Sequence, residues 1–227
     1  LSPAMKAALE EEDLDPSDIG LAADSKVWAK IDDSRYIPVP SSTTALPSGV
    51  YRVESTHQGP RILRVEQKAD NLIADPDPES PAYKLTAEIS AFWNKAERFN
   101  KMGFLHRRGY LLHGDPGTGK SCLMKQITDS LIADGGIALQ VNTVALLTVG
   151  LGMIRSVEPT RKIMCIFEDV ENFVNYDEAR LLAYLDGEDQ IQNVINVATT
   201  NHMDRLPPRI VQRPRRFDRI VEIPAPT

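Results

Sequence analysis

Hydrophobic and polar positions follow one pattern before residues 74–82 and another pattern after them. In the first part, apolar and polar residues alternate over residues 49–55 and 61–67, on either side of a short loop that contains glycine. Alternation with a period of two is typical of half-buried strands, so these runs predict a β-hairpin. Residues 26–31 have the composition of a further strand.

The stretch at 74–82, ADPDPESPA, holds three prolines and three acidic residues, which disfavour both a helix and a central strand, so it predicts a linker. Beyond it, apolar residues recur at helical spacing from Leu85 to Phe99, which predicts a helix packed on the domain that follows. The rest alternates between helical runs and short apolar runs. We expect strands within the runs at 109–113, 137–142, 163–168, 194–199 and 219–223.

Short apolar strands that alternate with helices are typical of a parallel sheet covered by helices on both faces. The sequence therefore predicts an α/β domain at residues 83–227. A small β-rich N-terminal module and the proline-rich linker are expected to occupy residues 1–82. With 42% hydrophobic and 26% charged residues, the chain has the composition of a globular protein with a proper core. No apolar run approaches the ~18 residues that a membrane span needs.

Charge and cysteine content narrow the functional class. The formal net charge of −6 weighs against a chain that binds nucleic acid along its whole length, although a local basic patch stays compatible with it. The two cysteines, Cys122 and Cys165, form no C-x-x-C pair, so we expect reduced thiols. Since no signal-peptide pattern is present at the N-terminus, the sequence predicts a cytoplasmic location.

Residues 114–121, GDPGTGKS, match the pattern G-x-x-x-x-G-K-[ST] between a predicted strand and a predicted helix. The glycines allow backbone N–H groups to turn inward and cradle phosphates, assisted by the positive end of the helix. Lys120 is expected to reach the β- and γ-phosphates, and the Ser121 hydroxyl to bind Mg²⁺. The predicted nucleotide-binding residues are Gly114, Asp115, Pro116, Gly117, Thr118, Gly119, Lys120, Ser121 and Cys122.

An apolar run ends in two adjacent carboxylates, Glu168 and Asp169, within the sequence IMCIFEDVE. The end of a strand can direct one carboxylate toward a metal ion and the next toward a water molecule placed for in-line attack. Asn201 follows the next predicted strand, where an amide could bond the γ-phosphate or that water. An Asn after a strand is also a common turn residue.

Near the C-terminus, the run QRPRRFDR contains four arginines, at positions 213, 215, 216 and 219. Arginine can stabilise the charge of a phosphoryl-transfer transition state, and a neighbouring subunit can supply it. Binding of nucleic acid is the rival interpretation of this cluster.

Five motifs, GDPGTGKS, IFEDVE, LLAYLDG, ATTN and RPRRFDR, resemble in their order and spacing the ATPase module of the AAA family, over residues 85–227. Within the family, the chain is most similar to the subgroup of the mitochondrial cytochrome bc-complex assembly chaperone. That subgroup also has two arginines and a glycine before the phosphate-loop motif, as at residues 107–109 here, and the same order of Glu then Asp at the end of the acidic strand. The resemblance implies a P-loop NTPase fold and a ring, usually of six subunits, with ATP between neighbours.

The resemblance also implies a role for each matched residue. Lys120 and Ser121 hold phosphate and Mg²⁺, Glu168 lies on the metal side, Asp169 activates water, Asn201 senses the γ-phosphate, and Arg213 and Arg216 are arginine fingers that act in trans.

Four departures accompany the resemblance. Arg215 stands where the family usually has Gly, and its role is not assigned. The segment from Leu147 to Gly150 lacks the aromatic residue of a substrate-threading pore loop. The family also continues into a helical lid, which is expected beyond Thr227, and the N-terminal module lacks the membrane helix of the bc-complex chaperones.

Three functions are compatible with these patterns. The favoured hypothesis is a ring-forming ATPase that remodels a protein partner recognised by the N-terminal module. A nucleic-acid motor or loader is the second, disfavoured by the overall acidity. The third is a nucleotide-gated scaffold with little hydrolysis, suggested by the reversed order of the two acids.

Overall fold

The computed structural model describes residues 27–30, 36–39, 41–57, 59–67, 79–213 and 215–224, and the chain divides into two units. The first unit, Leu1–Leu46, contains an antiparallel pair of strands, β1 (Val27–Lys30) and β2 (Tyr36–Val39). The strand expected at residues 26–31 is therefore present as β1.

The second unit, Pro47–Thr227, is built on one seven-stranded sheet with the order β4-β3-β6-β7-β8-β5-β9. Every neighbouring pair is parallel except β3 and β4, which form an antiparallel hairpin at one edge. The predicted parallel sheet is confirmed. Its strands are β3 (Gly49–Thr56), β4 (Gly59–Val65), β5 (Arg107–His113), β6 (Ile137–Gln140), β7 (Ile163–Phe167), β8 (Val194–Thr200) and β9 (Arg219–Glu222).

The β3–β4 hairpin belongs to this sheet, whereas the sequence suggested that it was part of a separate module ending at residue 82. Strand β3 pairs in parallel with β6, from Gly49 opposite Ile137 to Arg52 opposite Gln140. The division of the chain accordingly lies between Leu46 and Pro47. Most of the expected linker, residues 74–78, lies outside the described residues. Local alternation identified the hairpin but carried no information on its long-range pairing.

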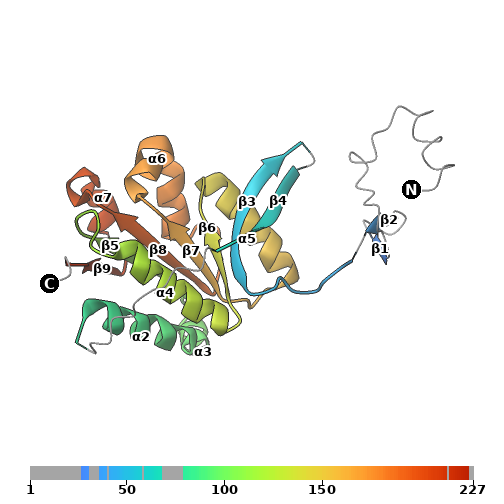
Figure 1. The fold of residues 1–227 in the computed structure, drawn as a ribbon, viewed down its shortest axis with the longest axis horizontal. Coiled ribbons are helices and arrows are strands. Elements are labelled where there is room, and N and C mark those ends of the chain that lie inside the picture. The colour runs from blue at the N-terminus through green and yellow to red at the C-terminus, as the bar shows by residue number, and fades with distance from the viewer. Residues whose placement is uncertain are drawn as a thin grey trace. The chain divides into compact units, whose positions relative to one another are not determined.

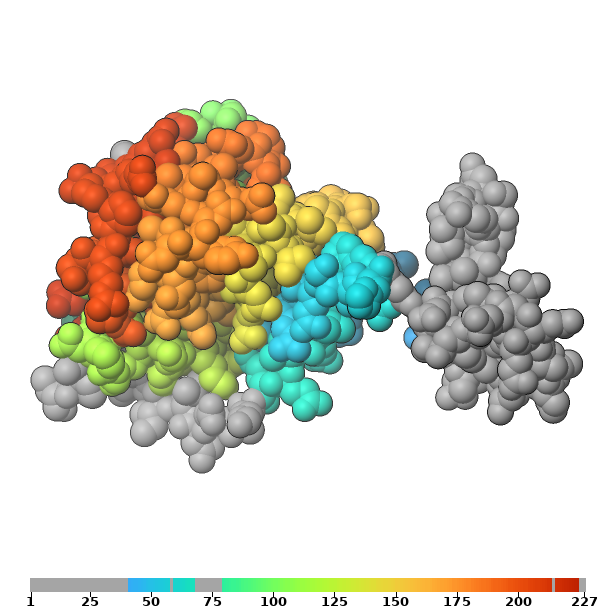
Figure 2. Space-filling model, turned by 90° about the horizontal axis from the view of Figure 1, so that it is seen from above, coloured from blue at the N-terminus to red at the C-terminus, as the bar shows by residue number. Residues whose placement is uncertain are grey.

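Helices cover both faces of the sheet, with α5 and α6 on one face and α2, α3 and α4 on the other (Figure 1). Figure 2 looks onto the face of α5 and α6, with the hairpin at one end and the segment around α7 and β9 at the other. Among the described residues, none of the helices is both long and apolar enough to cross a membrane. The helices are α2 (Pro81–Trp93), α3 (Ala96–Lys101), α4 (Lys120–Ala133), α5 (Val144–Val157), α6 (Val170–Asp186) and α7 (Pro208–Val211), and Met203–Arg205 form a 3₁₀ turn.

Local sequence explains where these helices begin and end. The Ser80 side chain accepts a hydrogen bond from Tyr83 N at 3.1 Å, and Pro81 occupies the first turn of α2, where its missing N–H costs nothing. The single helix expected from Leu85 to Phe99 is interrupted after Trp93, and α3 carries Phe99. Helix α4 stops before Gly135, whose φ of 79° suits glycine.

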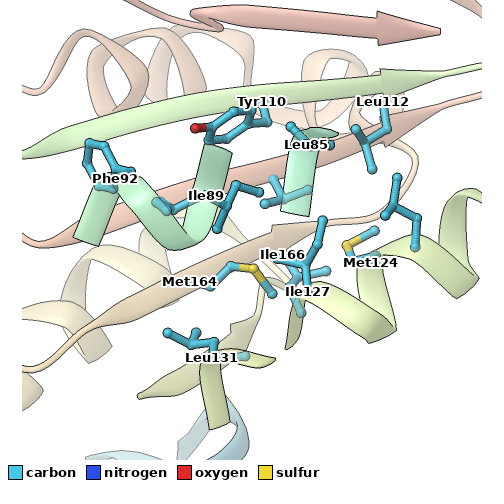
Figure 3. Close-up of a cluster of buried hydrophobic side chains, with 14 of the residues drawn as sticks. Leu85, Ile89, Phe92, Tyr110, Leu112, Met124, Ile127, Leu131, Met164 and Ile166 are labelled. Atoms are coloured by element: carbon cyan, nitrogen blue, oxygen red, sulfur yellow. The ribbon is translucent and has the colours of Figure 1, made fainter. Parts of the chain in front are cut away.

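The main hydrophobic core lies between the sheet and the layer formed by α2 and α4 (Figure 3). Side chains of β5 and β7 that alternate along each strand point into it, because residues two apart share a face. From the helices, residues spaced by three or four complete the contact, as the helical pattern predicted. The members labelled in Figure 3 are Leu85, Ile89, Phe92, Tyr110, Leu112, Met124, Ile127, Leu131, Met164 and Ile166.

The parallel pairing brings three carboxyl-terminal strand ends to one edge of the sheet. In the register, His113 of β5 lies opposite Thr200 of β8, and Phe167 of β7 lies opposite Ala198. The phosphate-binding loop, the two acids and Asn201 directly follow these ends. Ligands of open parallel sheets bind at such edges, so the topology gathers the predicted site.

Candidate functional site

The loop between β5 and α4 has a backbone that depends on glycine. Gly114, Gly117 and Gly119 have φ angles of 153°, 83° and 91°, in the region where side chains are disfavoured. At Gly114 a Cβ atom would also lie only 2.4 Å from the carbonyl oxygen of Ile223 on the neighbouring segment. The loop therefore turns tightly into the N-terminus of α4, as a phosphate cradle requires.

Lys120, the first residue of α4, lies beneath this loop and is 7% exposed. Its Nζ donates to the carbonyl oxygens of Gly114 at 2.7 Å and Asp115 at 2.8 Å, and to Thr118 Oγ1 at 3.4 Å. Three oxygens therefore surround the ammonium group. Phosphate oxygens could take their place without recruiting the lysine from elsewhere.

The other residues of the predicted loop occupy its rim. Thr118 is buried and its hydroxyl donates to Asp115 O at 2.9 Å, which closes the turn. Ser121 is exposed on the first turn of α4, and Cys122 behind it is half-buried. The hydroxyl of Ser121 is therefore available to a metal ion bound with phosphate, and the role of Cys122 in nucleotide binding stays a prediction. Pro116 and Asp115 are exposed at the tip.

The two carboxylates sit in different backbone settings at the end of β7. Both are exposed, and Asp169 adopts the left-handed conformation, with φ 48° and ψ 64°, immediately before α6. Asp and Asn tolerate this conformation better than most residues. The backbone N–H of Asp169 donates to Thr199 Oγ1 at 3.2 Å, which ties this turn to β8.

Asn201 lies between Asp169 and the phosphate loop. Its Nδ2 donates to Asp169 Oδ1 at 3.4 Å, and it also lines a pocket of about 250 Å³ that includes Gly114 and Thr118 of the loop. Asn201 is thus within reach of both parts of the predicted site. His113 and Glu222, at the ends of β5 and β9, line the same pocket. Sequence analysis missed them because neither belongs to the motifs, although each ends a strand beside the loop.

A Mg²⁺ ion fits this donor set as a companion of phosphate. Ser121 and Glu168 supply oxygen atoms, the ligands that Mg²⁺ prefers, and both side chains are exposed. In the part of the chain that the structure describes, no three His, Cys, Asp or Glu side chains form a ready cage for a metal. Mg²⁺ is usually held by one or two protein groups together with substrate phosphates and water, which agrees with such a sparse set.

The two predicted arginine fingers are placed differently. Arg213 is 61% exposed and its Nη1 lies 3.2 Å from Asp186 Oδ2. Arg216 is only 4% exposed, and its Nε and Nη2 each donate to Asp186 at 2.8 Å. Its Nη1 donates to the carbonyl oxygen of Arg209. The guanidinium group of Arg216 is thus engaged within its own chain and that of Arg213 is largely exposed, and the roles of both as fingers stay predictions.

The remaining arginines of the run also have partners. The guanidinium carbon of Arg215 lies 5.7 Å from the ring centroid of Phe104, and Arg219 Nε lies 3.3 Å from Glu88 Oε2. The run is consequently not a uniform basic patch.

Asp186 makes the stability of this corner sensitive to acid. Hydrogen bonds from Arg216, together with the charges of Arg216 and Arg213, lower the pKa of Asp186 and outweigh the opposing effect of burial. A depressed folded-state pKa stabilises the fold above the unfolded value of about 3.9, and this contribution is lost as the pH falls through the folded pKa. We expect the stability gap between the wild type and Asp186→Asn to be constant above about pH 5 and to shrink below about pH 4.

Urea unfolding at a series of pH values measures this gap. Asp134→Asn is the matched control, because Asp134 forms an exposed ion pair with Lys162 at 2.9 Å, and such pairs contribute about 0–1 kcal/mol. A gap for Asp186→Asn that is no larger than that of the control at pH 7 would contradict the assigned role.

The segment from Leu147 to Gly150 is helical, within α5, and is not a loop. Leu147 and Gly150 are buried, and a Cβ atom on Gly150 would lie 2.2 Å from Val53 Cγ2 of β3. This segment therefore packs against the sheet, which agrees with the absence of an aromatic grip.

Known proteins are similar to this chain over the region that holds these motifs. Residues 110–225, just over half of the chain, match the family described as "ATPase family associated with various cellular activities (AAA)". A proteasome-activating nucleotidase of Aeropyrum pernix is 32% identical over 148 residues, which cover 57% of this chain and 36% of that protein. The ATP-dependent zinc metalloprotease FtsH 2 of Sphaerobacter thermophilus is 30% identical over 205 residues, 82% of this chain and 30% of that protein.

The chain thus spans about a third of the length of the curated relatives it matches. The family match begins in β5 and includes the phosphate loop, both acids, Asn201 and the arginine run. The residues that the fold gathers at one edge of the sheet are therefore those that the family match covers. The chain belongs to the AAA family of ATPases.

Proposed function

We propose that this chain hydrolyses ATP with Mg²⁺ and uses the reaction, as part of a ring, to remodel a protein partner. The single observation that carries hydrolysis is the contact of Asn201 with Asp169, beside the pocket at the phosphate loop. This contact supports hydrolysis because a carboxylate and an amide lie together beside the phosphate loop. A pure nucleotide-gated scaffold has no need of that arrangement.

In the proposed reaction, the loop and Lys120 bind the phosphates, and Ser121 and Glu168 hold Mg²⁺. Bound Mg²⁺ would neutralise charge that develops on the phosphates. The Asp169 carboxylate accepts a proton from water as the water oxygen forms its bond to the γ-phosphorus and the bond to the β-phosphate oxygen breaks. Asn201 orients Asp169 and the water through its amide.

We assign the finger in trans to Arg213 rather than to Arg216. Arg213 is exposed and, among the described residues, forms one ion pair, with Asp186, whereas Arg216 is buried. Exposed ion pairs contribute little and exchange readily, so Arg213 can turn toward a phosphate on a neighbouring subunit. Arg216 instead keeps Asp186 and the end of α6 in place.

Mixed assemblies test this assignment. Arg213→Ala subunits and Asp169→Asn subunits should each be nearly inactive alone, but mixing them should restore part of the turnover, because some interfaces then combine an intact finger with an intact carboxylate. Steady-state phosphate release measures the effect. Turnover that stays at the level of the two separate variants would place the finger in cis.

The protein partner is inferred from the relatives, which are named as a proteasome-activating nucleotidase and ATP-dependent proteases. The arginine run argues against the nucleic-acid alternative, because three of its four arginines have acidic partners within the chain and the fourth lies over Phe104. We also propose that the module groups with the bc-complex assembly chaperones, on the strength of residues 107–109 and the order of Glu168 and Asp169.

Deletion of residues 1–46 tests where the partner binds. Because the second unit starts at Pro47 and includes the β3–β4 hairpin, this deletion should spare basal ATPase activity, whereas deletion to residue 82 should unfold the sheet edge. If the first unit recognises the partner, the shorter deletion abolishes stimulation of the ATPase by the partner. Stimulation that survives would locate the partner site on the ATPase unit.

A further inference from the structure

A second pocket, of about 470 Å³, lies at the amino end of β5, away from the phosphate loop. The loop from Gly103 to Leu105 forms one wall and the end of α6, at Leu185 to Gly187, forms another. Its size is typical of sites for small molecules. Arg107 and Arg215 are the two cationic side chains in its lining.

Arg107 enters this pocket as a cation without a carboxylate partner. Its guanidinium carbon lies 4.2 Å from the centroid of the buried Tyr184 ring. In the amide orientation of Asn196 that satisfies both of its polar atoms, the Asn196 oxygen accepts hydrogen bonds from Arg107 Nε and Nη2, each at 3.2 Å. The third nitrogen, Nη1, is buried and has no hydrogen-bond partner within the part of the chain that the structure describes. Among the described residues, no Asp or Glu forms an ion pair with Arg107. A buried guanidinium in this state is expected to attract an anion.

Gly187 lies beside the Arg107 guanidinium group in the wall of the pocket. Gly187 has a φ of 81°, and a Cβ atom there would lie 4.0 Å from Arg107 Nη1 and 3.2 Å from Leu105 Cδ1. The guanidinium group therefore lies beside Gly187, a residue of the pocket lining that carries no side chain.

Arg215 supplies the second charge at the cost of backbone strain. Its φ of 78° is unfavourable for any residue with a Cβ atom, and glycine would relieve it. The side chain instead lies over Phe104, which is 51% exposed. An arginine retained at a position that suits glycine indicates a function for its guanidinium group.

Two acids also line the pocket and offset part of this charge. Asp186 is already paired with Arg213 and Arg216, and Asp218 Oδ2 accepts a hydrogen bond from Gly109 N at 2.9 Å. Apolar groups of Phe99, Phe104 and Leu185 complete the lining. The pocket thus combines two cations with a ring-sized apolar wall.

We propose that this pocket binds a small organic anion, a carboxylate attached to an aromatic or similarly flat apolar body. Its carboxylate accepts hydrogen bonds from Arg215 and lies near the positive charge of Arg107, and its body packs against Phe104. This site is separate from the phosphate loop and does not depend on the proposed ATPase reaction.

Calorimetric titration of the full chain with 2-naphthoate tests the proposal, with 2-naphthamide as the uncharged analogue. We expect the carboxylate to bind at least about tenfold more tightly than the amide, and Arg215→Gly to remove most of that preference. Glycine suits the φ of this position, so the variant should fold normally. Arg108→Met is the matched control, because Arg108 pairs with Glu88 at 3.2 Å and does not line the pocket.

An Arg107→Met variant should lose the same preference, with circular dichroism as a check that it folds; if it does not fold, Arg215→Gly decides alone. Binding of 2-naphthoate should persist in Lys120→Ala, which separates this pocket from the nucleotide site. Equal affinities for acid and amide, no binding of either, or an unchanged preference in Arg215→Gly would overturn the proposal.

Discussion

A Lys120→Ala chain is expected to bind ATP at least about 100-fold more weakly than the wild type, which corresponds to about 3 kcal/mol or more. The ammonium group lies beneath the loop, bonded at 2.7 and 2.8 Å to two carbonyl oxygens that phosphate oxygens can replace. Its removal deletes a buried positive charge at the point where the phosphates carry most negative charge. Equilibrium titration with a fluorescent ATP analogue measures the loss.

The same lysine also bonds to the backbone of the loop, so loss of ATP binding must be separated from loss of structure. Thermal unfolding without nucleotide should show a modest decrease in the stability of Lys120→Ala. The hydrogen bonds of Lys120 are only some of those that close the turn. Lys125→Ala is the matched control on the same helix, because Lys125 pairs with Asp129 at 3.3 Å and is not part of the phosphate loop. ATP affinity retained in Lys120→Ala would remove the phosphate-loop assignment.

The sequence predicted the fold where the signal was local. Alternating strands and helices gave the parallel sheet, and Gly135 marked the end of α4. The place of the β3–β4 hairpin was not predictable in this way, because its pairing with β6 joins residues that are distant in the chain. The same applies to the break between α2 and α3, since the apolar spacing continues across it.

For the site, motif spacing identified the residue types but not their local partners. Lys120, Asp169 and Asn201 meet at one edge of the sheet because parallel strands end there. The burial of Arg216 depends on Asp186, at the far end of α6, and no spacing rule links the two. The unpartnered nitrogen of Arg107 is likewise visible only once β5, α6 and β8 are packed together.

Asp169→Asn is expected to lower ATP turnover by roughly 10²–10⁴-fold while ATP affinity changes little. An amide cannot accept the proton of the attacking water. The backbone should be unchanged, because Asn tolerates the left-handed conformation of residue 169 as well as Asp does. The hydrogen bond that Asn201 donates to residue 169 can also be kept, because the Asn side chain still has one oxygen acceptor. Single-turnover phosphate release, alongside ATP binding, separates the two effects.

The unusual order of Glu168 and Asp169 makes Glu168→Gln the decisive companion variant. If Glu168 lies on the metal side, this change should raise the Mg²⁺ concentration needed for half-maximal turnover, and excess Mg²⁺ should recover much of the rate. Asp169→Asn should show the opposite behaviour, a low rate that excess Mg²⁺ does not restore. If Glu168→Gln stays inactive at saturating Mg²⁺ while Asp169→Asn responds to the ion, then the two carboxylates have exchanged roles, and the longer side chain is the one that reaches the water.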